Sequence, residues 1–211
     1  LFLLASILLS VSLIPILLTE IKAPETDVQE SLGLKALWKA SPSGVATIGL
    51  SGLASAGFFG VGTIYAVKAG LSVSETALFM TLFIGFGAVS QWPLGWLSDK
   101  IDRRKVILLC CASVISICIV LVSFEFTSTI HLILSALVGA FTLPLYSIGV
   151  AQANDRLEPK QMISASGTIV LVFSVFAVLG PFTMSYFLEL FEMFGFMLYM
   201  GIVHLVMAIT V

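Results

Sequence analysis

The chain has 211 residues, of which 59% are hydrophobic and 10% are charged, and its formal net charge at pH 7 is −2. Soluble domains carry about 25% charged residues, so this composition, with a mean hydropathy of +1.12, excludes a soluble fold and indicates a membrane protein. The acidic balance leaves no basic face for phosphate groups, which excludes nucleic acid as a partner.

Seven runs of the sequence are apolar enough to cross a bilayer as helices, since one span needs roughly 17–25 residues. They cover residues 1–18, 43–67, 77–97, 106–124, 130–153, 162–188 and 193–211. Each run is continuously apolar and lacks the alternation of a membrane strand. The predicted fold class is therefore all-α, a polytopic membrane bundle with seven transmembrane helices.

The first run is followed by the longest connection, residues 19–42, which is long enough to separate two membrane modules. Inside it, the stretch "LGLKALWKA" places Lys35, Trp38 and Lys39 beside apolar residues. This pattern fits a short helix lying on the inner membrane interface, and a plain tether fits it equally well. Because the first and last runs lie at the chain ends, we expect the chain to be part of a longer protein.

The second run, residues 43–67, carries small residues at helical spacing: Gly49, Gly52, Ala56 and Gly60. Small residues on one face let two membrane helices approach closely. Simple packing explains the pattern, and a helix that slides against its neighbour is the alternative. The fourth run holds Cys110, Cys111 and Cys118, whose spacing matches no metal motif, so we expect buried packing thiols.

Nine of the ten Lys and Arg residues fall in connections on one side of the membrane, and only Lys68 falls on the other. By the positive-inside rule, the connections at 19–42, 98–105 and 154–161 are cytoplasmic. We also expect the protein to lie in a bacterial inner (plasma) membrane. We call the cytoplasmic ends of the helices their inner ends.

Four basic and two acidic side chains gather between Asp99 and Lys105, within "PLGWLSDKIDRRKV". Asp99 can accept hydrogen bonds at a helix N-terminus, and Arg103 and Arg104 can pair with carboxylates or carbonyls of a partner half. Such charges can form ion pairs and hydrogen bonds that are made in one conformation and broken in another. A positive-inside anchor with no moving part is the simpler explanation.

The order "GWLSDKIDRRK" resembles the loop signature of the major facilitator superfamily of secondary transporters, with Asp102 in place of the second glycine of that signature. The stretches "SGLASAGFFGVGTIYA", "SETALFM" and "QANDRLEPKQMISASG" are similar to the YcaD-like branch of this superfamily. The resemblance implies helices six to twelve of a twelve-helix transporter. Residues 1–18 would be the last helix of the N-terminal bundle, residues 19–42 the central loop, and residues 43–211 the C-terminal six-helix bundle.

What the resemblance implies about function is alternating access, in which two six-helix bundles rock about a central site. Helices seven, eight, ten and eleven would line the cavity, and the glycine-free runs 1–18 and 106–124 would face lipid as helices six and nine. The predicted function is secondary transport of an unidentified small molecule, and proton-coupled efflux is one form that it could take. The expected partners are the bilayer, the substrate and the missing N-terminal half of the same chain.

Two sets of candidate site residues follow. The predicted cytoplasmic gate consists of Gly95, Ser98, Asp99, Lys100, Arg103, Arg104, Asp155 and Arg156. The candidate cavity residues are the polar and aromatic side chains on the implied cavity helices: Tyr65, Gln91, Trp92, Tyr146, Gln152 and Asn154. For Asp155 and Arg156, plain helix capping is the alternative role. No catalytic residue, cofactor or metal site is expected.

Proton coupling would require a titrating group inside the membrane. His204 lies deep in the last run, where a neutral hydrogen-bonded histidine is the default and a proton-linked role the alternative. None of the apolar runs holds a membrane-embedded carboxylate. If transport is proton-coupled, we expect the titrating carboxylate in the missing half.

Three other classes of protein are alternatives to a transporter. Seven spans with "DRR" after the third resemble a seven-helix receptor, but the inner connections are short and the last run lacks proline. A membrane enzyme would need a nucleophile–base pair or paired carboxylates at membrane depth, and two distant histidines supply neither. A stand-alone membrane scaffold remains open.

Overall fold

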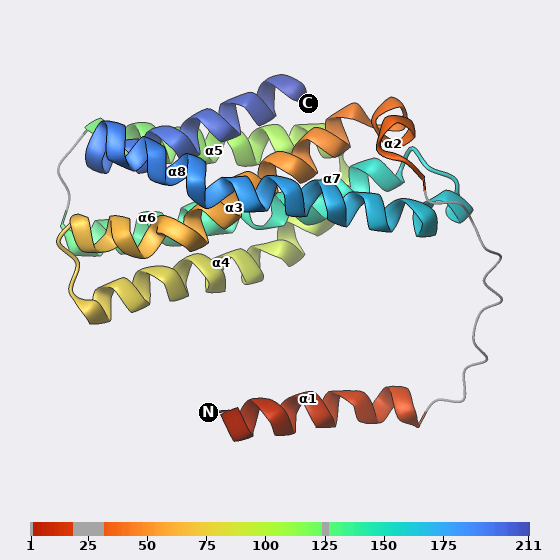
Figure 1. Ribbon diagram of the computed structural model, residues 1–211, viewed down its shortest axis with the longest axis horizontal. Coiled ribbons are helices and arrows are strands. Elements are labelled where there is room, and N and C mark those ends of the chain that lie inside the picture. The colour runs from red at the N-terminus through yellow and green to blue at the C-terminus, as the bar shows by residue number, and fades with distance from the viewer. Residues whose placement is uncertain (1, 19–31, 124–126) are drawn as a thin grey trace. The chain divides into compact units, whose positions relative to one another are not determined.

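The structure is a computed structural model that describes residues 2–18, 32–123 and 127–211 (Figure 1). Over these residues the regular secondary structure is entirely helical, which confirms the predicted all-α class. The helices are α1 (Phe2–Leu17), α2 (Leu34–Ala40), α3 (Pro42–Lys68), α4 (Val73–Lys100), α5 (Arg103–Ser123), α6 (Ser128–Thr142), α7 (Pro144–Asn154) and α8 (Pro159–Thr210).

The helices reproduce the predicted apolar runs. Five helical segments of the described residues are long and apolar enough to cross a membrane: α3, α4, α5, α6 with α7, and α8. With 52 residues, α8 would be about 78 Å long if straight, more than twice the thickness of a bilayer core. It therefore supplies two spans, and α1 covers the first run.

The chain forms two compact units, residues 1–30 and residues 31–211. In the first unit, α1 exposes its described side chains all round, as its uniformly apolar sequence leads one to expect. The second unit contains α2 to α8. Much of the predicted central loop, residues 19–31, lies outside the described residues, and the proposed division into an N-terminal helix, a loop and a C-terminal bundle stays a prediction.

Local capping signals explain where two of the long helices begin. The N-terminus of α4 is a capping box, in which Ser72 Oγ accepts from the Glu75 N–H and the Glu75 carboxylate accepts from the Ser72 N–H at 2.8 Å. At α8, Pro159 occupies the first turn and Gln161 Oε1 accepts from the Glu158 N–H at 3.0 Å. Both arrangements satisfy N–H groups that have no partner within the helix.

The two spans of α8 are joined at Glu192, whose backbone has φ 52° and ψ −135°. The chain folds back there so tightly that a Cβ at Gly195 would overlap the backbone of Phe187. Further along the two arms, Thr183 Oγ1 lies 3.0 Å from the Tyr199 hydroxyl. The arms of α8 therefore form a helical hairpin, seen as the two blue segments of Figure 1.

The backbone of Glu192 lies in a region that is almost restricted to glycine. Glu192→Gly is therefore expected to raise the free energy of unfolding by about 1 kcal/mol, measured by thermal unfolding of the detergent-purified full-length protein. Glu189→Gly, in the regular helix of the first arm, is the matched control and should lower it by about 1 kcal/mol. Equal effects of the two substitutions would show that Glu192 is not strained.

Small residues bring pairs of helices into backbone contact. A Cβ at Gly52 would lie 2.6 Å from the Phe173 carbonyl oxygen, and one at Gly60 would lie 2.8 Å from the Pro181 ring. The predicted small-residue face of α3 is thus confirmed as a packing face, directed at the first arm of α8. Between α4 and α6 the approach is closer, since a Cβ at Gly139 would overlap the Phe83 backbone.

The three cysteines are free and buried, as predicted. Cys110 and Cys111 belong to an apolar cluster that includes Leu145 of α7 and Met207 of the second arm of α8. Helix α5 therefore has one face buried in the bundle, while Leu109 and Ile119 are exposed on other faces. The expected lipid contact is limited to part of its circumference.

Candidate functional site

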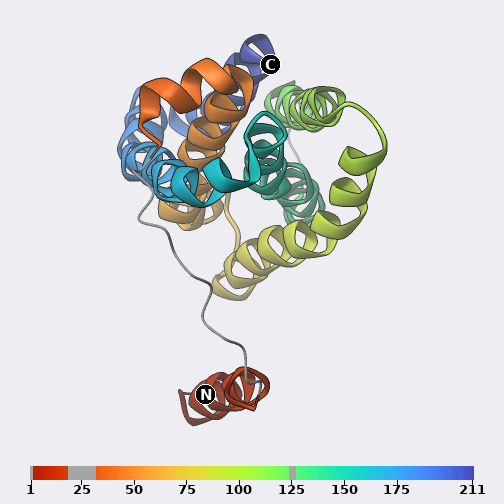
Figure 2. The same ribbon diagram turned by 90° about the vertical axis from the view of Figure 1, so that its right-hand side faces the viewer.

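Arg103 joins three helix ends at the inner end of the bundle, which faces the viewer in Figure 2. From the first turn of α5, its Nε donates to Asp155 Oδ2 at 2.7 Å, just after α7. Its Nη1 lies 2.9 Å from both Asp99 Oδ1 and Ser98 Oγ in the last turn of α4. One guanidinium thus links α4, α5 and α7.

The tight turn between α4 and α5 positions this guanidinium. Ser98 is buried and its hydroxyl is 2.8 Å from the Gly95 carbonyl oxygen, which holds its Oγ beside Arg103. The Arg104 N–H donates to Asp102 Oδ1 at 2.9 Å. Asp102, which departs from the family signature, therefore caps the start of α5, a role that we did not assign from the sequence although a short acidic residue before a helix is a known capping signal.

The ion pairs of Arg103 are only partly shielded from water. The Arg103 side chain is 17% exposed, while those of Asp99 and Asp155 are 65% and 50% exposed. Pairs of this kind contribute about 0–1 kcal/mol each to stability. Breaking these ion pairs therefore costs little free energy. Such contacts can form in one conformation and open in another.

Arg103 has two carboxylate partners within this unit, Asp99 and Asp155. The pairing of Arg103 and Arg104 with carboxylates or carbonyls of a partner half stays a prediction. Lys100 Nζ lies 5.9 Å from the centre of the Trp96 ring. A Cβ at Gly95 would meet nothing within 4 Å, so this side of α4 is open.

A polar depression of about 350 Å³ surrounds the Arg103 contacts. Five of the eight predicted gate residues line this depression: Ser98, Asp99, Arg103, Asp155 and Arg156. The depression itself is lined by Ser98, Asp99, Ile101, Asp102, Arg103, Gln152, Asp155 and Arg156. The structure therefore brings most of the predicted gate residues together, although they come from two segments about 50 positions apart.

The predicted cavity residues do not form one cluster. Tyr65 is buried near the outer end of α3, where its ring stacks on Phe196 with centroids 4.3 Å apart. Gln91 and Trp92 are exposed on the inner half of α4. Tyr146 packs edge-on against Phe173. Among the six residues only Gln152 lines the depression, and Asn154 is the last residue of α7.

Gln152 belongs to a buried polar seam between α7 and the start of α3. Its side-chain Nε2 donates to Ser43 Oγ at 3.3 Å, and its backbone carbonyl oxygen accepts from Ser41 Oγ at 3.3 Å. Along α3 the seam continues through buried hydroxyls at Thr47, Ser51 and Ser55, which bond to carbonyls of their own helix. The four-residue spacing of Ser43, Thr47, Ser51 and Ser55 was a signal in the sequence that we did not use.

The fifth span is broken between α6 and α7 at Pro144, which has no N–H for the Ala140 carbonyl. Ser90 of α4 occupies the vacant place, with its Oγ 2.7 Å from the Ala140 oxygen. Before the break, α6 packs mainly on α4, and after the break α7 packs mainly on α3. His204 Nδ1 donates to the Met200 carbonyl at 2.8 Å, and its Nε2 lies 3.3 Å from Thr142 Oγ1, beside the break.

Ser90→Ala is expected to lower the free energy of unfolding by about 1–2 kcal/mol, because the buried Ala140 carbonyl would lose its donor. Adding Pro144→Ala should recover most of this loss, since an alanine supplies the missing N–H. Thermal unfolding of the full-length protein measures both. Ser116→Ala, which removes a hydroxyl bonded to the carbonyl of its own helix, is the control, and a loss as large as that of Ser90→Ala would contradict the prediction.

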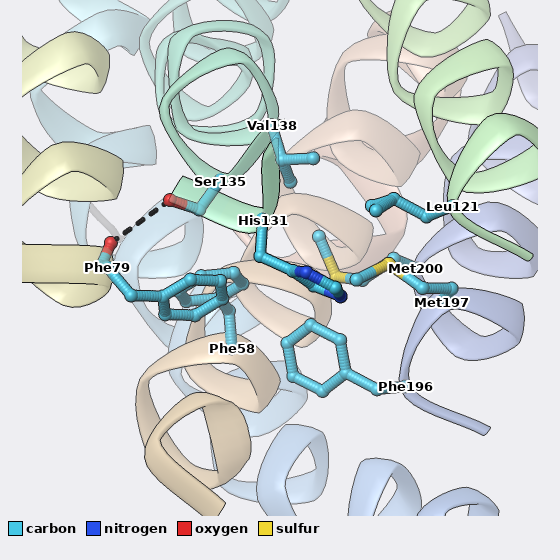
Figure 3. Close-up of a pocket in the computed structure, with 9 residues that line it drawn as sticks. All are labelled: Phe58, Phe79, Leu121, His131, Ser135, Val138, Phe196, Met197 and Met200. Atoms are coloured by element: carbon cyan, nitrogen blue, oxygen red, sulfur yellow. Dashed lines mark hydrogen bonds between the residues drawn. The ribbon is translucent and has the colours of Figure 1, made fainter. Parts of the chain in front are cut away.

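Near the outer end, aromatic and methionine side chains fill the space between the helices (Figure 3). Phe58 stacks on Phe83 and Phe79, and Phe196 packs edge-on against Phe58. The cavity left among these rings, Met200 and their neighbours is about 10 Å³, scarcely enough for one water. A substrate cannot occupy this part of the unit as it stands.

Comparisons with known proteins agree with the loop signature. The model of the family described as the Major Facilitator Superfamily matches residues 1–211. The chain is 26% identical over 171 residues to the uncharacterized MFS-type transporter YcaD of Salmonella arizonae, covering 80% of this chain and 44% of the relative. It is 24% identical over 176 residues to the YcaD of Escherichia fergusonii, covering 82% and 45%. The chain thus spans less than half the length of the relatives it matches.

Proposed function

Because the chain belongs to the major facilitator superfamily, we propose that it forms helices six to twelve of a secondary active transporter that works by alternating access. The YcaD-like resemblance inferred from the sequence is confirmed. The transported substrate is an unidentified small molecule, and proton-coupled efflux is the form of transport to test first. The N-terminal half that completes the site is supplied by the rest of the same protein.

The Arg103 contacts are the observation that supports this proposal most directly. They tie the inner ends of α4, α5 and α7 through side chains that remain accessible to water. Ion pairs that are cheap to break and that link separate helices are suited to a gate at the cytoplasmic end. The gate that we propose consists of Gly95, Ser98, Asp99, Lys100, Arg103, Arg104, Asp155 and Arg156.

The cavity that we propose is lined by α3, α4, α6 with α7, and the first arm of α8. Gln91 and Trp92 are exposed along α4, so they are free to face a central cavity once the other half is present. Gln152, Asn154 and Tyr146 would lie on the neighbouring wall, and Tyr65 near the closed outer end. Such polar and aromatic groups, few in number, are typical of ligand sites in apolar surroundings.

The protein is an integral membrane protein, and we place it in the inner (plasma) membrane of a bacterium, with the connections at 19–42, 98–105 and 154–161 in the cytoplasm. The distribution of Lys and Arg supports this orientation. Membership in a family of transporters argues against an enzyme, and it leaves the seven-helix receptor with no supporting observation.

Cysteine accessibility in the full-length protein tests the proposal. Gln91→Cys and Val89→Cys place a thiol on nearly opposite faces of α4, both at exposed positions. In inside-out membrane vesicles, a membrane-impermeant maleimide should label the thiol at position 91, which faces the cavity, and spare the one at position 89, which faces lipid. The native Cys110, Cys111 and Cys118 are buried, which keeps their contribution to the background low.

The outcomes separate the possibilities. Labelling at position 91 alone supports a water-filled path along the proposed face. Labelling at position 89 alone would place the cavity on the other face of α4 and overturn the residue assignment. The transporter proposal requires a path that water can enter from the cytoplasm. If neither thiol reacts, either in vesicles or in solubilised protein that opens inward, that path is absent and the proposal is contradicted.

A further inference from the structure

A groove lies beside the short helix α2, which stands at the inner end of the bundle (Figure 2). Its volume is about 500 Å³, and its walls come from α2, the first turns of α3 and the first arm of α8. The lining residues are Leu34, Lys35, Trp38, Val45, Ala46, Val172 and Phe176. All are apolar except Lys35, so the groove is a hydrocarbon-like slot with one cation at its rim.

The wall formed by α2 is firmly held. Leu37 is 0% exposed and packs among Val45, Ile48 and Ala165. Just before α2, the Leu32 carbonyl accepts from Thr168 Oγ1 at 2.6 Å, and the Leu32 N–H donates to the Ser164 carbonyl. The helix is therefore a fixed element of the bundle, and its position on the inner membrane interface stays a prediction.

The burial of Leu37 does not extend to Leu34 and Trp38, which lie beside it on α2. Trp38 is 50% exposed, Leu34 is exposed beside it, and both line the groove. Lys35 and Lys39 are four residues apart, so their ammonium groups project from one side of α2. An indole with neighbouring lysines is the pattern of a protein surface at the level of lipid headgroups.

We propose that this groove binds an anionic phospholipid of the inner leaflet, with an acyl chain along Trp38, Ala46 and Phe176 and the headgroup phosphate at Lys35. The charges favour this occupant over a protein segment. The groove opens on the side of the membrane where nine of the ten Lys and Arg residues lie, and basic groups there attract anionic lipids. The apolar lining from Trp38 to Phe176 also suits an acyl chain.

Quenching of Trp38 fluorescence by brominated lipids tests the proposal. The full-length protein is placed in mixed micelles with dibrominated phosphatidylglycerol or dibrominated phosphatidylcholine, and the Trp38 signal is the difference between wild type and Trp38→Phe. We expect phosphatidylglycerol to quench Trp38 at about fivefold lower mole fraction than phosphatidylcholine, because one lysine near the headgroup strengthens the binding of an anionic lipid by about this factor.

Two variants probe the two parts of the site. Lys35→Gln should abolish the preference for phosphatidylglycerol, while Lys160→Gln, the same charge change on another inner connection, should keep it. Ala46→Phe should fill the slot and reduce quenching by both lipids, while Ala112→Phe, on an exposed position of α5, should leave it intact.

Three results would overturn the proposal. Equal preference in Lys35→Gln and Lys160→Gln would remove the headgroup contact, and unchanged quenching in Ala46→Phe would remove the acyl-chain site. Absence of quenching by either lipid in the wild type would show that protein, not lipid, covers Trp38.

Discussion

Arg103→Gln is expected to open the cytoplasmic gate of the full-length transporter. The substitution removes the donors that reach Asp155, Asp99 and Ser98 at 2.7–2.9 Å. If the two ion pairs together hold the closed gate by about 1–2 kcal/mol, their loss shifts the open fraction by about 5- to 30-fold. Labelling of a cysteine at position 91 from the cytoplasmic side should accelerate accordingly.

Matched variants assign this effect to the geometry of Arg103. Lys105→Gln removes the same charge two residues away and should leave the labelling rate near wild type. Arg103→Lys keeps the charge but cannot reach α4 and α7 at once, because a single ammonium lacks the fork of the guanidinium. It should therefore resemble Arg103→Gln.

A double-mutant cycle tests the Asp155 contact specifically. Asp155→Asn should also accelerate labelling, and adding Arg103→Gln to it should have less effect than Arg103→Gln alone, because the two residues share the contact. Additive effects would contradict a gate built on this pair. Equal labelling rates in Arg103→Gln and Lys105→Gln would contradict the gate altogether.

Gly139→Ala is expected to cause a large loss of stability. A Cβ there would overlap the Phe83 backbone, which cannot move without displacing α4. Forcing α4 and α6 apart should cost about 3 kcal/mol or more. Thermal unfolding of the detergent-purified full-length protein, together with the yield of monodisperse protein, measures this loss.

Alanine substitutions at two further glycines of the same region should cause smaller losses of stability or none. At Gly87 a Cβ would meet the side chain of Leu143, which can adjust, so Gly87→Ala should be intermediate. At Gly85 nothing lies within 4 Å, and Gly85→Ala should be neutral or stabilise by up to about 1 kcal/mol, the difference in helix propensity. The graded order keeps the prediction testable even if Gly139→Ala does not fold, and equal effects at Gly139 and Gly85 would refute it.

The sequence was sufficient for the features that depend on local chemistry. Hydropathy located the membrane helices, since a bilayer demands about 20 apolar residues in succession. The loop signature around Asp99 and Arg103 led to the family, and Gly49, Gly52 and Gly60 marked the face of α3 that packs on α8.

Only the tertiary structure shows which distant groups meet. Arg103 pairs with Asp155, the Ala140 carbonyl with Ser90, and Gln152 with Ser43. It also shows that the predicted cavity residues are spread over separate parts of the unit. The break between the runs 162–188 and 193–211 was predicted, but only the structure places the reversal at Glu192 itself, where neither glycine nor proline stands.

The physical reason is that lipid and protein interior are both apolar. A soluble helix displays its buried face as an apolar stripe, whereas a membrane helix is apolar on every side, and its rotation is set by close contacts between small residues on neighbouring helices. The sequence therefore indicates that a helix crosses the membrane but not which of its sides faces the partner. That orientation, decided here by contacts such as Gly139 on Phe83, is what brings Arg103 to Asp155.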